Sequence, residues 1–216
     1  AWDHSSYVGA IGVTGSNAAN NMAKQADLVL AIGTRLNDFN SGSRALFSSA
    51  TIVQLNVARF DAIKHNALPL WGDAKLGIQQ LDTKLSNWKV SKEWVDLAHE
   101  ESSKWNNYYD EITSIKSASK TMDSLPTDAQ VLGELKRNGK ANDIVVCAAG
   151  SLPGELHKLW RTEQIGGYHA EYGFSCMGYE IAGGLGVKMA EPEREVIVLV
   201  GDGSYLMLNS ELATSV

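Results

Sequence analysis

The turn near the end of the chain constrains the fold more than any other feature. Residues 196–200 are an unbroken apolar run rich in β-branched side chains, which is typical of a parallel strand covered on both faces. Gly201-Asp202-Gly203-Ser204 follows, and the pattern after it predicts a helix. The glycines let a ligand approach the backbone closely, and a helix start offers unpaired N–H groups to an anion. Asp202 adds a hard oxygen suited to Mg²⁺ or Ca²⁺, so the turn predicts a metal-assisted anion site.

Two other interpretations of this turn have to be weighed against that one. A strand-to-helix turn without any ligand fits equally well wherever Gly-Asp-Gly stands alone. A dinucleotide site, as in a non-catalytic nucleotide-binding module, needs a third glycine where this sequence has Leu206. The choice between these interpretations therefore depends on the rest of the chain.

Composition narrows the class of protein. With 44% hydrophobic and 20% charged residues, the 216-residue chain is typical of a soluble globular protein. The net charge of -6 argues against nucleic acid as a partner, and no apolar stretch reaches the length of a membrane span. A cytoplasmic location without membrane partners is therefore the expectation. Cys147 and Cys176 have no metal-binding spacing and are expected to be reduced.

The first part of the chain alternates apolar runs with helical patterns. The runs at 27–33 and 51–57 predict buried strands, and the spacing of leucine and isoleucine over 73–88 predicts a helix. Strands that alternate with helices predict βαβ units around a parallel sheet.

A second series of the same kind follows Thr127, which can cap a helix that ends near residue 138. The later elements are predicted as strands at 143–149 and 166–170, a helix at 176–190 and the strand at 196–200. The glycines inside the helix at 176–190 cost about 1 kcal/mol each relative to alanine, so we expect close packing of this helix on a sheet or another helix. Right-handed crossovers place the Gly150-Ser151 turn and the Gly201–Ser204 turn at the carboxyl edge of one sheet.

Between the two series, residues 91–120 form a polar, charged helix or helix pair. Its apolar positions recur at helical spacing and predict one packed face rather than a ligand site; they are Trp94, Ala98, Trp105, Tyr108, Ile112 and Ile115. The predicted fold class is thus α/β, with two incomplete doubly wound parallel-sheet domains joined by a helical connector.

Four segments of the sequence resemble thiamine-diphosphate enzymes of the acetolactate synthase-like group. Gly150 to Gly154, His169 to Glu180 and Gly201 to Leu212 resemble the diphosphate-binding domain of that family, and Gly15 to Arg35 resembles its central, Rossmann-like domain. The resemblance covers nearly the whole chain. It implies a partial central domain at 1–86, a connector at 87–122 and a partial domain for thiamine diphosphate and Mg²⁺ at 123–216.

The resemblance also implies roles for individual residues. Asp202 matches the Mg²⁺ ligand, and Gly201, Gly203 and Ser204 match the turn that contacts the diphosphate. Ser175 stands where a backbone carbonyl receives the 4′-amino group of the cofactor, and Met177 matches the apolar residue beneath the cofactor. A second set of diphosphate contacts corresponds to Gly150, Ser151 and Leu152.

Within the family, the motifs are most similar to members that hydrolyse a C–C bond of a polyol-derived cyclic 1,2-dione in inositol breakdown, giving an open-chain deoxyuronic acid. An acetolactate synthase-like lyase or transferase is the alternative. The resemblance implies carbanion chemistry on the cofactor. It assigns no catalytic residue to this chain. His157, His169 and Glu171 are the titratable residues close in sequence to the cofactor segments, and His169 and Glu171, two apart, are the candidates for proton transfer. A salt bridge at the end of a strand fits these two residues equally well.

Members of this family are longer than 216 residues, and their activating glutamate lies in a pyrimidine-binding domain that has no counterpart here. The chain is therefore expected to be a fragment that is inactive alone and that belongs to a homo-oligomer, at least a dimer. FAD in the central domain is not expected, although the resemblance leaves it open.

Overall fold

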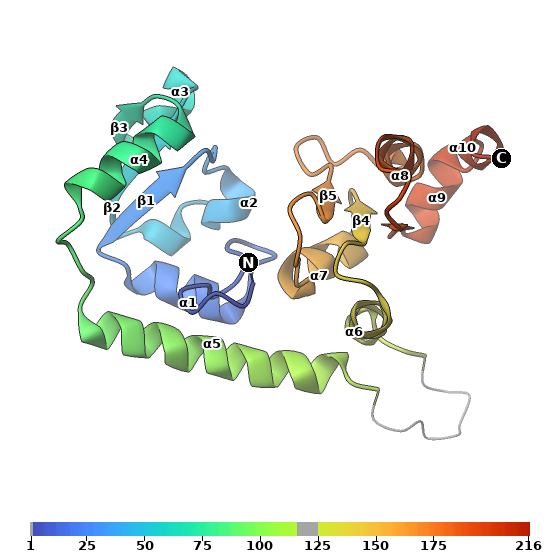
Figure 1. The fold of residues 1–216 in the computed structure, drawn as a ribbon, viewed down its shortest axis with the longest axis horizontal. Helices are drawn as coiled ribbons and strands as arrows, with labels where there is room; N and C mark the ends of the chain where they lie inside the picture. The colour runs from blue at the N-terminus through green and yellow to red at the C-terminus, as the bar shows by residue number, and fades with distance from the viewer. Residues whose placement is uncertain (1, 116–124) are drawn as a thin grey trace. The chain divides into compact units, whose positions relative to one another are not determined.

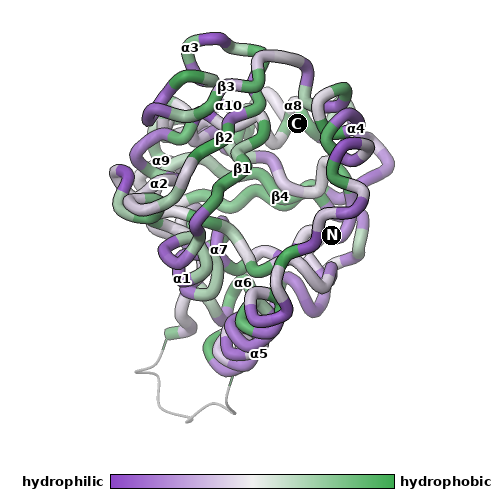
Figure 2. Tube along the Cα trace, turned by 90° about the vertical axis from the view of Figure 1, so that its left-hand side faces the viewer, coloured by the Kyte–Doolittle hydropathy of each residue, from purple (hydrophilic) through white to green (hydrophobic). Residues whose placement is uncertain are grey.

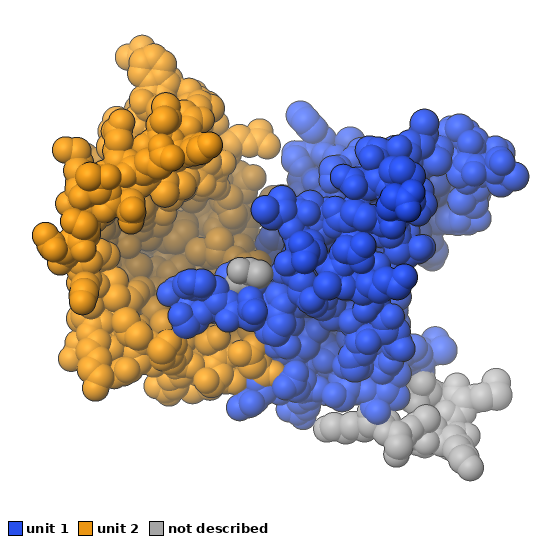
Figure 3. Space-filling view, viewed as in Figure 1, with its two compact units in different colours: residues 1–7, 107–216 blue, residues 8–106 orange. Residues whose placement is uncertain are grey.

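The computed structural model describes residues 2–115 and 125–216, which pack as two compact units (Figures 1 and 3). One unit comprises residues 8–106, and the other comprises residues 1–7 together with residues from 107 onward. The predicted division at 86 and 122 stays a prediction, since the second boundary lies outside the described residues. None of the described helices is both long and apolar enough to cross a membrane.

The unit of residues 8–106 is built on a sheet of three parallel strands in the order β1-β2-β3. These strands are β1 (Leu28–Ile32), β2 (Thr51–Asn56) and β3 (Leu68–Trp71). The two predicted strands are confirmed. The sequence did not single out β3, because it has only four residues and contains Pro69, which is tolerated at an edge position.

Short helices surround this sheet. They are α1 (Asn17–Gln25), α2 (Asp38–Ser41), α3 (Arg59–Ala62), α4 (Ala74–Lys84) and the 3-10 helices η1 (Ala45–Phe47) and η2 (Lys64–Asn66). The Oγ of Ser16 caps α1 by accepting the N–H of Ala19 at 3.1 Å, and Asp73 caps α4 in the same way. A core that includes Leu46, Phe47 and Ile52 forms beneath α1 and η1.

Helix α5 (Lys92–Thr113) confirms the predicted helical stretch, and Figure 2 shows it as mainly hydrophilic, in contrast to the largely apolar strands. Its packed face differs from the prediction by one position. Tyr109 is 7% exposed, whereas Tyr108 is 49% exposed. The 3.6-residue period of a straight helix carries the buried stripe from Trp105 to Tyr109, four residues on.

The second unit contains a sheet of three parallel strands in the order β5-β4-β6. These strands are β4 (Ile144–Cys147), β5 (Tyr168–Ala170) and β6 (Val196–Val198), and every residue of the central β4 is buried. Helices α6 (Asp128–Asn138), α7 (Ser151–Leu159), α8 (Tyr179–Ala190), α9 (Asp202–Leu208) and α10 (Glu211–Thr214) accompany them. The parallel sheets flanked by helices confirm the α/β class.

Close packing against the sheet explains part of the unusual glycine content of helix α8. A Cβ on Gly184 would lie 2.3 Å from Cγ2 of Val198 in β6, so the glycine lets α8 approach the strand. The predicted approach to a sheet is confirmed at this position. The helix begins at Tyr179 rather than Cys176, because the preceding residues form a separate loop held by side-chain hydrogen bonds.

Candidate functional site

The candidate site is the carboxyl edge of the sheet β5-β4-β6. The strands are parallel neighbours, with Val146 in register with both His169 and Val198. The loops that follow them therefore leave the same edge, which confirms that the Gly150 and Gly201 turns lie at one end of one sheet. The chain passes from β4 to β5 on one side and then through α8 to β6 on the other. In open α/β sheets, the loops at such a reversal are where ligands bind.

The loop after β4 turns sharply at Gly150. Its φ of 119° lies in a region that side-chain-bearing residues rarely adopt, so only glycine takes this conformation without strain. Helix α7 begins directly afterwards at Ser151, which is exposed, while Leu152 is half-buried. The backbone at this turn is therefore accessible next to a helix start.

The turn after β6 combines open space with a carboxylate. No atom lies within 4 Å of the position that a Cβ of Gly201 would occupy, and its φ of -76° is ordinary. Glycine at 201 thus provides room rather than an unusual backbone conformation. Asp202 is exposed in the first turn of α9, and its Oδ1 accepts the N–H of Gly203 at 2.8 Å. Ser204 is 2% exposed and lies beneath this turn.

The loop after β5 contacts the turn after β6. Cε of Met177 lies 3.4 Å from the position of a Cβ on Gly203, so these two residues, predicted from separate motifs, are neighbours. Gly178 packs on α9, where its Cβ would lie 2.9 Å from Cβ of Leu208. Ser175 is exposed and has a φ of 53°, which is uncommon for a residue other than glycine.

The donor set fits a magnesium diphosphate. Among the described residues there is no group of three or more His, Cys, Asp or Glu side chains that could enclose a metal ion. Asp202 therefore offers a single protein carboxylate next to open backbone. Mg²⁺ is commonly held by one or two carboxylates together with phosphate oxygens and water, so this arrangement suits an ion that arrives with a diphosphate.

The two candidates for proton transfer lie at the end of β5. His169 is an exposed residue of the strand, and Glu171 follows it. Glu171 accepts the N–H groups of Cys176 and Phe174, and these bonds hold the pKa of the carboxyl below its ordinary value. Both of its oxygens are therefore engaged in the loop. A catalytic role of either residue stays a prediction.

Sequence reasoning did not assign Glu180, the second residue of α8. Its side chain is 0% exposed, and Oε2 accepts the N–H of Gly178 at 2.9 Å. Oε1 is buried without a hydrogen-bond partner in the part of the chain that the structure describes. Nearby, burial raises the pKa of the Cys147 thiol to about 11, and the charge of Glu180 adds to this effect. The sequence did carry a signal for a buried carboxylate at this position, namely an acidic residue at the start of a helix otherwise rich in glycine and apolar residues.

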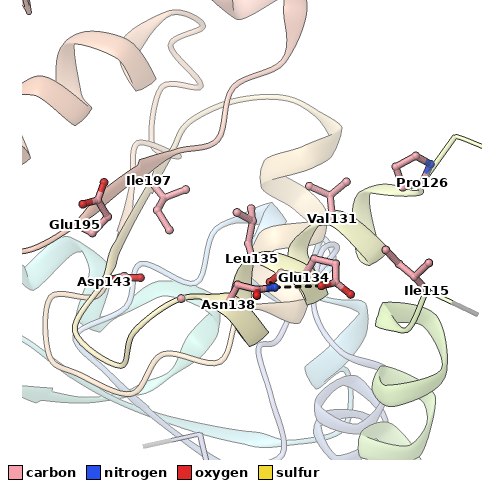
Figure 4. A pocket seen from close by; sticks show the side chains of 10 residues that line it. Ile115, Pro126, Val131, Glu134, Leu135, Asn138, Asp143, Glu195 and Ile197 are labelled. Atoms are coloured by element: carbon pink, nitrogen blue, oxygen red, sulfur yellow. Dashed lines mark hydrogen bonds between the residues drawn. The ribbon is translucent and has the colours of Figure 1, made fainter.

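The cavity in Figure 4 lies away from this edge. Asp143 and Glu195, which precede β4 and β6, line it, so it opens at the amino end of the sheet. Its volume is about 540 Å³, and the remaining wall comes mainly from α6, including Val131, Glu134, Leu135 and Asn138. It therefore takes no part in the candidate site.

Comparisons with known proteins match two separate stretches of the chain. The central domain of thiamine pyrophosphate enzymes matches residues 1–81, and their C-terminal TPP-binding domain matches residues 148–216. A curated relative from Clostridium tetani, named 3D-(3,5/4)-trihydroxycyclohexane-1,2-dione hydrolase, is 39% identical to this chain. The match covers 100% of this chain and 37% of the relative. The corresponding protein of Geobacillus thermodenitrificans is 43% identical over 98% of this chain and 36% of its own length. The chain thus spans little more than a third of the length of these relatives.

Proposed function

Because the chain belongs to the thiamine pyrophosphate enzyme family, we propose that it is part of an enzyme that hydrolyses a C–C bond of trihydroxycyclohexane-1,2-dione. The proposal includes release of an open-chain deoxyuronic acid during inositol breakdown. It draws on the names of the relatives, which are 38% to 43% identical over nearly all of this chain.

The single observation that carries the proposal is the convergence of three loops at the edge where the strand order reverses. Asp202 would ligate Mg²⁺, and the turn Gly201–Ser204 together with Gly150, Ser151 and Leu152 would contact the diphosphate. The carbonyl of Ser175 would receive the 4′-amino group, and Met177, beside Gly203, would support the cofactor from below. When bound, thiamine diphosphate supplies a carbon nucleophile and an acceptor for the electrons of the broken bond.

In this proposal the residues of this chain bind and orient thiamine diphosphate and Mg²⁺. One residue remains as a candidate for proton transfer. His169 is an exposed residue of β5 and is the candidate for exchange of a proton with a bound substrate. The engaged oxygens of Glu171 make it a poorer candidate. The proposal further includes a homo-oligomer, a cytoplasmic location, no nucleic-acid or membrane partner, and no FAD.

Substrate turnover by the protein that carries this chain tests the proposal. We expect it to consume the cyclic dione only when both Mg²⁺ and thiamine diphosphate are present, and to leave pyruvate unchanged. Conversion of pyruvate to acetolactate would favour the acetolactate synthase-like alternative. Binding of a nucleotide without binding of thiamine diphosphate would favour a nucleotide-binding module.

A further inference from the structure

The loop after β5 is held by a single carboxylate that brackets Ser175. Oε1 of Glu171 accepts the N–H of Phe174 at 2.9 Å, and Oε2 accepts the N–H of Cys176 at 2.7 Å. These are the amides of the residues before and after Ser175, whose φ of 53° is unfavourable for a side-chain-bearing residue. The two bonds therefore hold the one residue of this loop whose backbone has to be constrained.

The bond to Cys176 also fixes the direction of the Ser175 carbonyl. The N–H of Cys176 and the C=O of Ser175 belong to one peptide group, and the described residues contain no cis peptide bond. In a trans peptide the C=O and N–H groups point in opposite directions. Because this N–H points at Glu171, the Ser175 carbonyl points away from Glu171. The position of the carboxylate thus sets where the carbonyl is aimed.

The other end of the loop is anchored separately. The buried Glu180 accepts the N–H of Gly178, which has a φ of 94° and packs against Leu208 of α9. Neither of these contacts reaches the peptide group between Ser175 and Cys176. Orientation of that peptide group therefore depends on Glu171.

We propose that Glu171 is a positioning residue that aims the Ser175 carbonyl at the 4′-amino group of bound thiamine diphosphate. Glu180 fixes the end of the same loop and does not set this direction. The inference rests on the proposed function, because it requires thiamine diphosphate in the site. It gives Glu171 a role through the backbone, in place of the proton transfer that its sequence position suggested.

The test pairs a protein variant with a change in the ligand. In the protein that carries this chain, calorimetry with saturating Mg²⁺ would measure the Kd of thiamine diphosphate and of an analogue in which hydrogen replaces the 4′-amino group. The wild type is expected to prefer the amino-bearing ligand roughly tenfold, the effect of one well-aligned hydrogen bond. In Glu171→Gln one of the two N–H groups faces the amide NH2, which is itself a donor, so the pair of bonds that holds Ser175 on both sides is lost and the preference should fall to about twofold or less.

Glu134→Gln is the matched control. Glu134 has an ion pair with Arg137 on α6, whose end leads into the amino edge of the sheet, so this variant removes the same charge away from the loop. It should keep the tenfold preference. Glu171→Asp serves as a second variant if Glu171→Gln does not fold. Its shorter carboxylate cannot reach both N–H groups, so it should also lose the preference.

Three results would overturn the inference. If Glu171→Gln weakened both ligands equally and kept the tenfold preference, the carboxylate would stabilise the loop without aiming the carbonyl. A wild type that binds both ligands equally tightly would remove the Ser175 carbonyl from the cofactor site. A wild type that binds neither ligand would refute the proposed function itself, and so it is distinguishable from the other two.

Discussion

The two sheets of this molecule follow the same alternation of strand and helix but differ at their carboxyl edges. In the sheet β1-β2-β3 the strands follow one another in chain order, so the sheet has no reversal. Part of its edge is closed by its own side chains, since Gln54 and Asn56 both donate to the carbonyl of Thr34, at 2.8 and 2.9 Å. In the sheet β5-β4-β6 the order reverses at β4. Both edges carry a glycine with open space at the position of its Cβ and an exposed aspartate after it, Gly72 and Asp73 in the first sheet and Gly201 and Asp202 in the second, so the reversal of strand order is what separates them.

Because both sheets share the alternation of strands and helices, we expect the reversal of strand order to decide which of them binds a ligand. Connections that leave a central strand in opposite directions separate two neighbouring loops, and the backbone between them stays accessible. The predicted ligand residues all lie in the sheet with the reversal.

Two aspartates provide the sharpest test of this comparison. Each follows a glycine at the end of a parallel strand and opens a helix: Asp73 after Gly72, and Asp202 after Gly201. Asp73 caps α4 through the N–H of Leu76 at 3.0 Å, whereas Asp202, among the residues that the structure describes, accepts only the N–H of Gly203. Asp202→Asn should weaken Mg²⁺-dependent binding of thiamine diphosphate roughly tenfold or more, because a neutral amide oxygen holds the ion less well.

Asp73→Asn should leave both cofactor affinity and stability nearly unchanged, because asparagine caps a helix as well as aspartate does. Thermal unfolding and calorimetry of both variants check the pair. Asp202→Asn should change the free energy of unfolding by only about 0.5 kcal/mol or less, and excess Mg²⁺ with cofactor should restore part of the activity. Equal affinities of Asp202→Asn and wild type would make Asp202 a structural turn residue.

A second prediction concerns the closed edge. Gln54 is 0% exposed, and its Nε2 bonds to Thr34, while Oε1 has no partner among the residues that the structure describes. Gln54→Ala removes a hydrogen bond and leaves a cavity, so it should lower the free energy of unfolding by about 2–3 kcal/mol. Affinity for thiamine diphosphate, measured by calorimetry on folded protein, should not change. A loss of affinity at unchanged stability would show that the closed edge also serves the ligand.

The sequence predicted the parts of this comparison that depend on local pattern. Apolar runs located β1, β2 and β4, and the parallel arrangement followed from the helices between them, so the common edge of the Gly150 and Gly201 turns could be deduced. The proline in β3 concealed that strand. The burial of Tyr109 in place of Tyr108 could be found only from the helical period that α5 actually has. The loop before α8 could not be predicted, because it depends on Glu171 and Glu180 accepting backbone N–H groups two to five residues away. Such contacts form only once the strand and helix are placed.

The smallest expected effect is a pH-dependent difference in Tm, and it compares two carboxylates, one in each unit. Bonds from Cys176 and Phe174 lower the pKa of Glu171, and bonds from Asn21 and Lys104 lower the pKa of Glu101, both from an ordinary value of 4.5. A carboxyl with a lowered pKa in the folded state stabilises the fold above the pKa of the unfolded chain, and this contribution is lost as the pH falls through the folded value. The difference in Tm between wild type and Glu171→Gln or Glu101→Gln should therefore be largest above pH 4.5 and shrink as the pH falls below that value. Added salt should reduce the Glu101 difference more, because Lys104 is a charged partner and the amides that hold Glu171 are neutral. If the Glu171 difference instead grew on acidification, the carboxylate would not be the acceptor of these two N–H groups.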